Sequence, residues 1–227
     1  MNASRNRKLL TAVALAAGPL FAAGFASNAM ATIQIQLTSG GFTTTNTGAG
    51  GIVSYSGTVG QWSINTPSGV SLGPGTTSID LSTINATAAA GAAPLTILLT
   101  DTGYTTPVSG FTMTGSGHIV GSGAGTATFD AYTDANTPFA TTIHIGTLGP
   151  FTGLYAASQS FNVTPSSNPY ELTEQLVLTT TGSNGVEWST DSSTVGIPRV
   201  PEPASLTLLG SALIGLGWLG RRRRKTV

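Results

Sequence analysis

The chain is 227 residues long and poor in charge, because Asp, Glu, Lys and Arg together make up only 8% of it. Its net charge of zero hides a segregation: three bases lie in the first ten residues, five lie in the last seven, and residues 32–200 hold eight acids against Arg199 alone. A body with one base cannot neutralise many phosphates, which excludes nucleic acid as a partner and argues against phosphoryl-transfer chemistry.

The N-terminus has the three-part layout of a secretory signal peptide. A basic start precedes the apolar run Leu9 to Phe25, and Ala29 and Ala31 then occupy the −3 and −1 positions of a cleavage site. A permanent N-terminal membrane anchor is the alternative, but Gly18-Pro19 would interrupt its helix. We therefore predict that residues 1–31 are a signal peptide cleaved after Ala31.

Residues 32–199 are predicted to form an all-β body, a β-sandwich or a jelly-roll-like fold. Short β-branched runs alternate with period two and are broken by Gly, Pro, Asn and Ser clusters, while no stretch follows the helical period. About ten such strands favour a sandwich or jelly roll, which at this length buries a core without disulfides. The predicted strands are Ile33–Leu37, Ile52–Val59, Gln61–Asn65, Ser78–Asn85, Leu95–Thr100, Gly110–Met113, Gly125–Tyr132, Ala140–Gly146, Leu154–Val163, Leu172–Thr181 and Val186–Thr190.

Glycine marks three predicted connections in this body. A hairpin is expected around Gly60, between the second and third runs. The glycine-rich tract Gly115–Gly125 lacks the aspartates of a calcium-binding repeat and is expected to be a flexible hairpin loop. Asn184-Gly185 predicts a type I′ hairpin between the last two strands. The chain holds no cysteine, so disulfides are impossible, and an exported protein without cysteine fits a bacterium.

Two short motifs resemble those of hydrolases. Gly69-Val70-Ser71-Leu72-Gly73 matches G-x-S-x-G, but Pro67 before it and Pro74-Gly75 after it exclude the helix that a nucleophile elbow needs. Asp101-Thr102-Gly103 resembles the active-site triplet of aspartic proteases, whose chemistry needs two carboxylates. The sequence has no second triplet, so only a homodimer could supply the pair. We interpret this triplet as a strand end followed by a turn.

Histidine and aspartate give weak metal signals. His118 and His144 lack metal-ligand spacing, and alternation places His144 on the polar face of its strand. Asp130 and Asp134 flank a strand end and could join backbone carbonyls around calcium, although no EF-hand pattern supports this. We predict no metal and no cofactor.

Two further groups of residues have a functional and a structural interpretation. Glu171 and Glu174 could form a glycosidase pair, but acids on a strand are expected to solvate one face of it. Five aromatic residues could stack on sugar rings, although packing in the core is favoured for them. They are Tyr55, Trp62, Tyr132, Tyr155 and Trp188.

The C-terminus combines three features in a fixed order. Val200-Pro201-Glu202-Pro203 leads into an uncharged run, Ala204 to Gly220, which is followed at once by Arg221-Arg222-Arg223-Arg224-Lys225. The uncharged run would rise about 25 Å as a helix, the short end of a membrane span, and the basic cluster would hold the end of the chain in the cytoplasm. A plain tail anchor does not explain the two prolines, which force an extended segment suited to the cleft of a processing enzyme.

This order resembles the C-terminal signal of the PEP-CTERM family of exported bacterial proteins. The resemblance covers Val200 to Lys225 only. It implies a Gram-negative source that makes exopolysaccharide, transient anchoring in the inner membrane, and an exosortase, a membrane-embedded cysteine peptidase that recognises this tail. It does not define the function of the body, because bodies in this family vary widely.

The predicted organisation is therefore a signal peptide (1–31), a β-body (32–199) and a sorting signal (200–227). We favour a non-enzymatic surface or matrix protein associated with exopolysaccharide or the envelope, because this function needs only a sorting signal and a stable body. The alternative is an exported hydrolase that acts on polysaccharide or protein. It needs a catalytic constellation, and each candidate motif fails on its sequence context.

Overall fold

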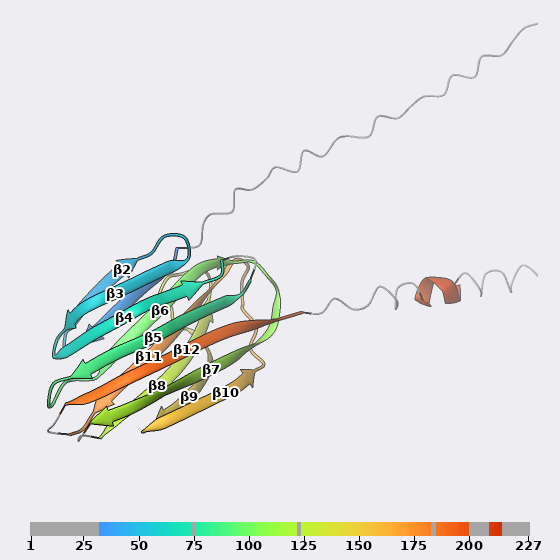
Figure 1. Cartoon of the computed structure of the whole chain (residues 1–227). Coiled ribbons are helices and arrows are strands. Elements are labelled where there is room, and N and C mark those ends of the chain that lie inside the picture. The colour runs from blue at the N-terminus through green and yellow to red at the C-terminus, as the bar shows by residue number, and fades with distance from the viewer. Residues whose placement is uncertain (1–31, 74–75, 122–123, 183–184, 200–208, 215–227) are drawn as a thin grey trace, which may run out of the picture.

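The computed structural model shows a sandwich of two six-stranded antiparallel β-sheets packed face to face (Figure 1). The structure describes residues 32–73, 76–121, 124–182, 185–199 and 209–214. The predicted signal peptide with Ala29 and Ala31, the Val200-Pro201-Glu202-Pro203 segment and the arginine cluster lie outside the described residues. Of the predicted span Ala204 to Gly220, residues 209–214 are described and are helical. Within the described ranges, no helix has the length and the apolar character that crossing a bilayer requires.

Each sheet draws its strands from the whole length of the body. Sheet A contains, in spatial order, β2 (Phe42–Thr47), β1 (Gln34–Ser39), β6 (Leu95–Tyr104), β11 (Tyr170–Thr180), β8 (Gly125–Asp134) and β9 (Ile143–Phe151). Sheet B contains β10 (Leu154–Phe161), β7 (Val108–Gly121), β12 (Val186–Pro198), β5 (Ser78–Ala88), β4 (Trp62–Ser71) and β3 (Ile52–Val59).

Strands β5 to β12 have the connectivity of a jelly roll. The run β5 to β8 pairs with the run β12 to β9 in reverse order, as β5–β12, β6–β11, β7–β10 and β8–β9. Successive strands lie in opposite sheets except β8 and β9, which share sheet A. This winding is the jelly-roll form of the predicted sandwich. The hairpin β1–β2 extends sheet A beside β6, and β3–β4 extends sheet B beside β5.

Alternation along the strands builds the core. In β8, Ala127, Phe129 and Ala131 point inward and are buried, while the residues between them are partly exposed. At the centre of the interface, the rings of Trp62 in β4 and Trp188 in β12 lie 4.8 Å apart between centroids, and both side chains are buried. Burial of such apolar area is the main favourable term in folding, so these alternating strands hold the sheets together.

The hairpin expected around Gly60 is confirmed, because β3 and β4 pair from Val59 and Trp62 outward. The other two glycine predictions are wrong. Gly115 and Gly117 lie inside β7, paired on both sides by β10 and β12. A Cβ at Gly117 would lie 2.4 Å from the carbonyl oxygen of Ser189, so glycine permits the close approach of β12.

The predicted hairpin at Asn184-Gly185 does not form, because β11 lies in sheet A and β12 in sheet B. The connection therefore crosses from one sheet to the other, and Asn184 itself lies outside the described residues. Strand β2, Phe42–Thr47, has no predicted counterpart, because its sequence of mostly hydroxyl side chains carries no alternation.

We expect Trp188→Ala in the body to lower its free energy of unfolding by about 3–5 kcal/mol, because the substitution leaves a cavity against Trp62. In thermal unfolding followed by circular dichroism, the melting temperature should fall by about 10 °C. Phe42→Ala is the control, since this ring is 65% exposed and its loss should change little. Equal effects of the two substitutions would contradict the central role of the tryptophan pair.

Candidate functional site

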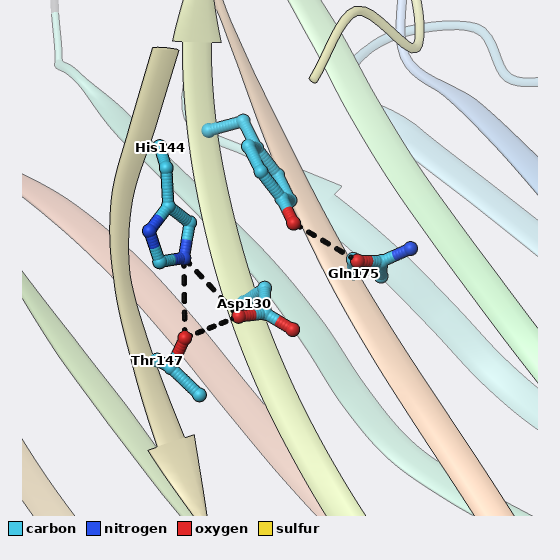
Figure 2. A network of polar contacts seen from close by, with 5 residues as sticks. Asp130, His144, Thr147 and Gln175 are labelled. Atoms are coloured by element: carbon cyan, nitrogen blue, oxygen red, sulfur yellow. Dashed lines mark hydrogen bonds and ion pairs between the residues drawn. The ribbon is translucent and has the colours of Figure 1, made fainter. Parts of the chain in front are cut away.

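A network of polar side chains lies on the outer face of sheet A (Figure 2). The register places Thr147 of β9 opposite Asp130 of β8, and Asp130 opposite Gln175 of β11. His144 Nε2 lies 3.2 Å from Asp130 Oδ1 and 3.1 Å from Thr147 Oγ1, and Thr147 also donates a hydrogen bond to Asp130. The predicted outward position of His144 is confirmed, since its side chain is 49% exposed.

The histidine in this network is not arranged for nucleophilic catalysis. A catalytic imidazole uses one ring nitrogen for the nucleophile and the other for the orienting carboxylate. Here both Thr147 and Asp130 approach the same nitrogen, Nε2, so the ring cannot relay a proton between them. The geometry fits a surface cluster in which Asp130, His144 and Thr147 satisfy one another's hydrogen bonds.

Asp130 and Asp134 do not converge on a common cation. They lie four residues apart on the same face of β8, which separates their Cα atoms by about 13 Å. Asp130 accepts from His144 and Thr147, and Asp134 Oδ1 accepts from the backbone N–H of Ala135 at 2.6 Å. Among the residues that the structure describes, no group of three His, Cys, Asp or Glu side chains could hold a metal ion.

The expectation that Glu171 and Glu174 solvate a strand face is wrong, because both side chains are buried. Glu174 points into the core between the sheets. Its carboxyl oxygens lie 3.1 Å from Ser192 Oγ and 2.7 Å from Thr194 Oγ1, both on β12 of the opposite sheet. Burial raises the pKa of Glu174 to about 8, and these two hydroxyls only partly oppose the shift. The carboxyl group therefore bridges the two sheets in its protonated form at neutral pH.

Glu171 precedes Glu174 by three residues in β11 and points to the outer face of sheet A, away from the core that Glu174 enters. Its Oε2 atom accepts hydrogen bonds from Thr100 at 2.9 Å and from Thr173 at 3.2 Å, while Oε1 is buried with no partner among the described residues. Burial raises its pKa to about 7. Successive residues of a strand point to opposite faces, and so do residues three apart. Glu171 and Glu174 therefore cannot flank one glycosidic bond.

The serine and aspartate of the two hydrolase-like motifs meet inside the sandwich, a contact that neither motif predicts by itself. Asp101 lies within β6, paired with Leu172 of β11, so its interpretation as a turn residue is wrong. Ser71 at the end of β4 donates to the Asp101 carboxyl and lies 2.9 Å from the hydroxyl of Tyr104, which donates to the Ser78 carbonyl at 2.9 Å.

Asp101, Ser71, Tyr104 and the Ser78 carbonyl form one buried hydrogen-bonded group. Burial raises the pKa of Asp101, although the hydrogen bond that it accepts from Ser71 opposes the shift. The group is fully buried and contains no base, because His118 and His144 lie on outer faces. It satisfies buried polar groups at one end of the sandwich.

Three of the five aromatic residues considered for sugar stacking pack in the core, as favoured. Trp62, Trp188 and Tyr155 are 8% exposed or less. Tyr132 lies on the outer face of sheet A, where its hydroxyl donates to Gln175 Oε1 at 3.2 Å and its ring lies 5.2 Å from that of His144. The structure therefore builds no exposed platform from the two tryptophans.

The chain matches the family model of the PEP-CTERM protein-sorting motif over residues 199–224. The match begins at the residue that follows β12 and includes the segment Val200-Pro201-Glu202-Pro203 and the arginines Arg221, Arg222, Arg223 and Arg224. No curated protein matches the chain. The family match therefore bears on the sorting of this chain and does not extend to residues 32–198 of its body.

The burial of Glu174 predicts that alkaline pH destabilises the body. The pKa of Glu174 is about 8 in the folded protein against an ordinary 4.5. The contribution of this group to the free energy of unfolding is therefore fully present below pH 4.5 and is lost as the pH rises to about 8. Glu174→Gln keeps the shape and cannot ionise. We expect the variant to melt about 5 °C or more above the unsubstituted protein at pH 8.5, and to lose less stability between pH 5.5 and 8.5.

The control for this measurement is Glu187→Gln, which alters an exposed carboxyl on β12 and should leave the pH dependence unchanged. Parallel loss of stability in Glu174→Gln and the unsubstituted protein would show that Glu174 does not carry the effect.

Proposed function

Because the chain carries a PEP-CTERM protein-sorting motif at residues 199–224, we propose that it is an exported, non-enzymatic protein of the cell surface or extracellular matrix of a Gram-negative bacterium. Its precursor is held in the inner membrane by the C-terminal segment until an exosortase-type peptidase processes it. The processed body then associates with the envelope or with exopolysaccharide. The sorting motif is the observation that carries this proposal.

The end of the body is firmly attached to the sandwich, which supports a direct coupling between body and signal. The backbone N–H of Arg199 donates to the Pro107 carbonyl at 3.2 Å, and Arg199 Nε donates to the Val108 carbonyl at 3.0 Å. The motif therefore starts where the last strand ends, with no linker between them. The peptidase would meet Pro201-Glu202-Pro203 immediately beside the folded body.

The state of the acidic side chains supports a non-enzymatic body. A hydrolase needs a carboxylate or nucleophile that substrate can reach. Asp101, Glu171 and Glu174 are buried, and each contacts hydroxyl groups of the protein itself. The cluster of Asp130 with the half-exposed His144 lacks the geometry of a proton relay.

The non-enzymatic assignment is tested by assaying the purified body against a panel of polysaccharides and casein. We expect no turnover. Hydrolysis that disappears in Asp101→Asn or Glu171→Gln, with the fold intact by circular dichroism, would establish the exported hydrolase instead. Both substitutions keep the side-chain volume, so loss of packing would not mimic loss of catalysis.

Glu202→Ala should prevent processing, because the proposed role of the Pro-Glu-Pro segment is to present this carboxylate in an extended backbone. Cells that produce the variant should accumulate a membrane-bound precursor, while the unsubstituted protein is released only when the exosortase gene is present. Intact mass of the membrane and medium fractions measures both. Glu187→Ala makes the same change of charge in the body and should be processed normally. Release of Glu202→Ala at the normal mass would contradict the proposal.

A further inference from the structure

The outer face of sheet B contains a hollow of about 270 Å³ that crosses β4, β5, β12 and β7, four neighbouring strands in Figure 1. Two cross-strand rows of side chains line it. The register places Ser63 opposite Thr87 and Thr87 opposite Glu187 in one row. The other row runs Asn65, Asn85, Ser189, His118. We call these seven residues the sheet B groove.

The polar side chains of this groove are free to bind a ligand. Within the described ranges, none of these seven side chains makes a hydrogen bond to another residue. Elsewhere on the outer faces polar side chains pair with one another, as in Gln36 with Thr45 on sheet A and Thr114 with Ser193 on sheet B. The groove, by contrast, presents an organised set of unused donors and acceptors.

The chemistry of this set suits a polyhydroxylated ligand. Asn65 and Asn85 sit directly opposite each other, and each amide offers donors and an acceptor. Sugar hydroxyls both donate and accept, so amides and hydroxyls in adjacent rows can bind them in pairs. At the β7 end, Val120 is 48% exposed and Leu154 of β10, opposite His118, is 87% exposed. These two side chains provide apolar surface for the C–H face of a sugar ring.

The charges around the groove favour a neutral ligand over an anionic one. Glu187 lines the groove, and Asp191 lies at the outward position of β12 that follows Ser189. Asp80 is close enough to raise the pKa of Asp191, after the larger effect of burial. The only lysine or arginine in residues 32–200, Arg199, follows the far end of β12, about 33 Å along the strand from Ser189. A polyanion would meet repulsion from Glu187 and Asp191 with no lysine or arginine near them.

We propose that the sheet B groove binds a segment of neutral polysaccharide lying across β4, β5, β12 and β7. Three strand spacings make this path about 14 Å long, enough for a short run of sugar rings. The hollow is near the lower end of the range for ligand sites, about 300–1,000 Å³, as expected for a groove that holds part of a long chain. The inference rests on the proposed function, to which it adds the site and the class of polysaccharide.

The test is affinity electrophoresis in native gels that contain dextran, hydroxyethyl cellulose or polygalacturonate. It uses the exported protein purified from its producing cells in whichever form, released or membrane-bound, it accumulates. We expect retardation by at least one neutral polymer and none by polygalacturonate. Asn65→Ala combined with Asn85→Ala should weaken that retardation at least tenfold in apparent Kd. The matched control, Gln36→Ala with Thr45→Ala, removes a cross-strand pair from sheet A and should retain full binding.

Several outcomes would overturn the proposal: no retardation by either neutral polymer, equal retardation by polygalacturonate, or equal loss in the control pair. If the double asparagine variant does not fold by circular dichroism, Asn85→Ser replaces it, and its unchanged binding would also overturn the proposal. Exosortase-dependent release is measured separately by intact mass. A protein that is released but binds no polymer therefore refutes the groove alone, and a retained protein that binds refutes the sorting proposal alone.

Discussion

The pairing of β12 with both β5 and β7 is the constraint on which the rest of the molecule depends. This strand lies between β5 and β7 and contributes side chains to both the inner and the outer face of sheet B. Its inward residues include Trp188, which meets Trp62, and Thr194, which holds Glu174 across the core. Its outward residues Glu187 and Ser189 line the groove. Core packing, the inter-sheet hydrogen bond and the proposed ligand site therefore all depend on the register of β12 with β5 and β7.

Buried carboxyl groups define a second feature of this fold. Taking a charge out of water is costly, and the body holds three buried carboxyls without an opposite charge beside them. Burial raises the pKa of each of the three, which favours the neutral form, and Ser and Thr hydroxyls hydrogen-bond to them. Thr194 and Ser192 do so for Glu174, and Ser71 for Asp101. A chain rich in hydroxyl residues and poor in bases thus uses hydrogen bonds where other proteins use ion pairs.

Local sequence patterns predict the strands of this body better than its site. Alternation predicts most strands, and it also indicates that two of the acids are buried. Glu174 shares the parity of Leu172 and Leu176, and Asp101 shares the parity of Ile97 and Leu99, so both belong on the buried face. The expectation that acids face solvent outweighed that parity. The groove was beyond local reasoning, because its rows join residues from 63 to 189 and depend on which strands become neighbours.

The place of β12 in the chain has a consequence for the timing of folding during export. Strand β12 is the last strand of the body, yet it separates β5 from β7, so sheet B cannot close until the final body residues have crossed the membrane. Folding governed by contacts so distant in sequence is slow, which keeps the translocating chain unfolded and able to thread. The sandwich is completed only as the sorting motif reaches the membrane. The last strand of the body and the start of the sorting motif therefore cross the membrane together, because the motif begins at the residue after β12.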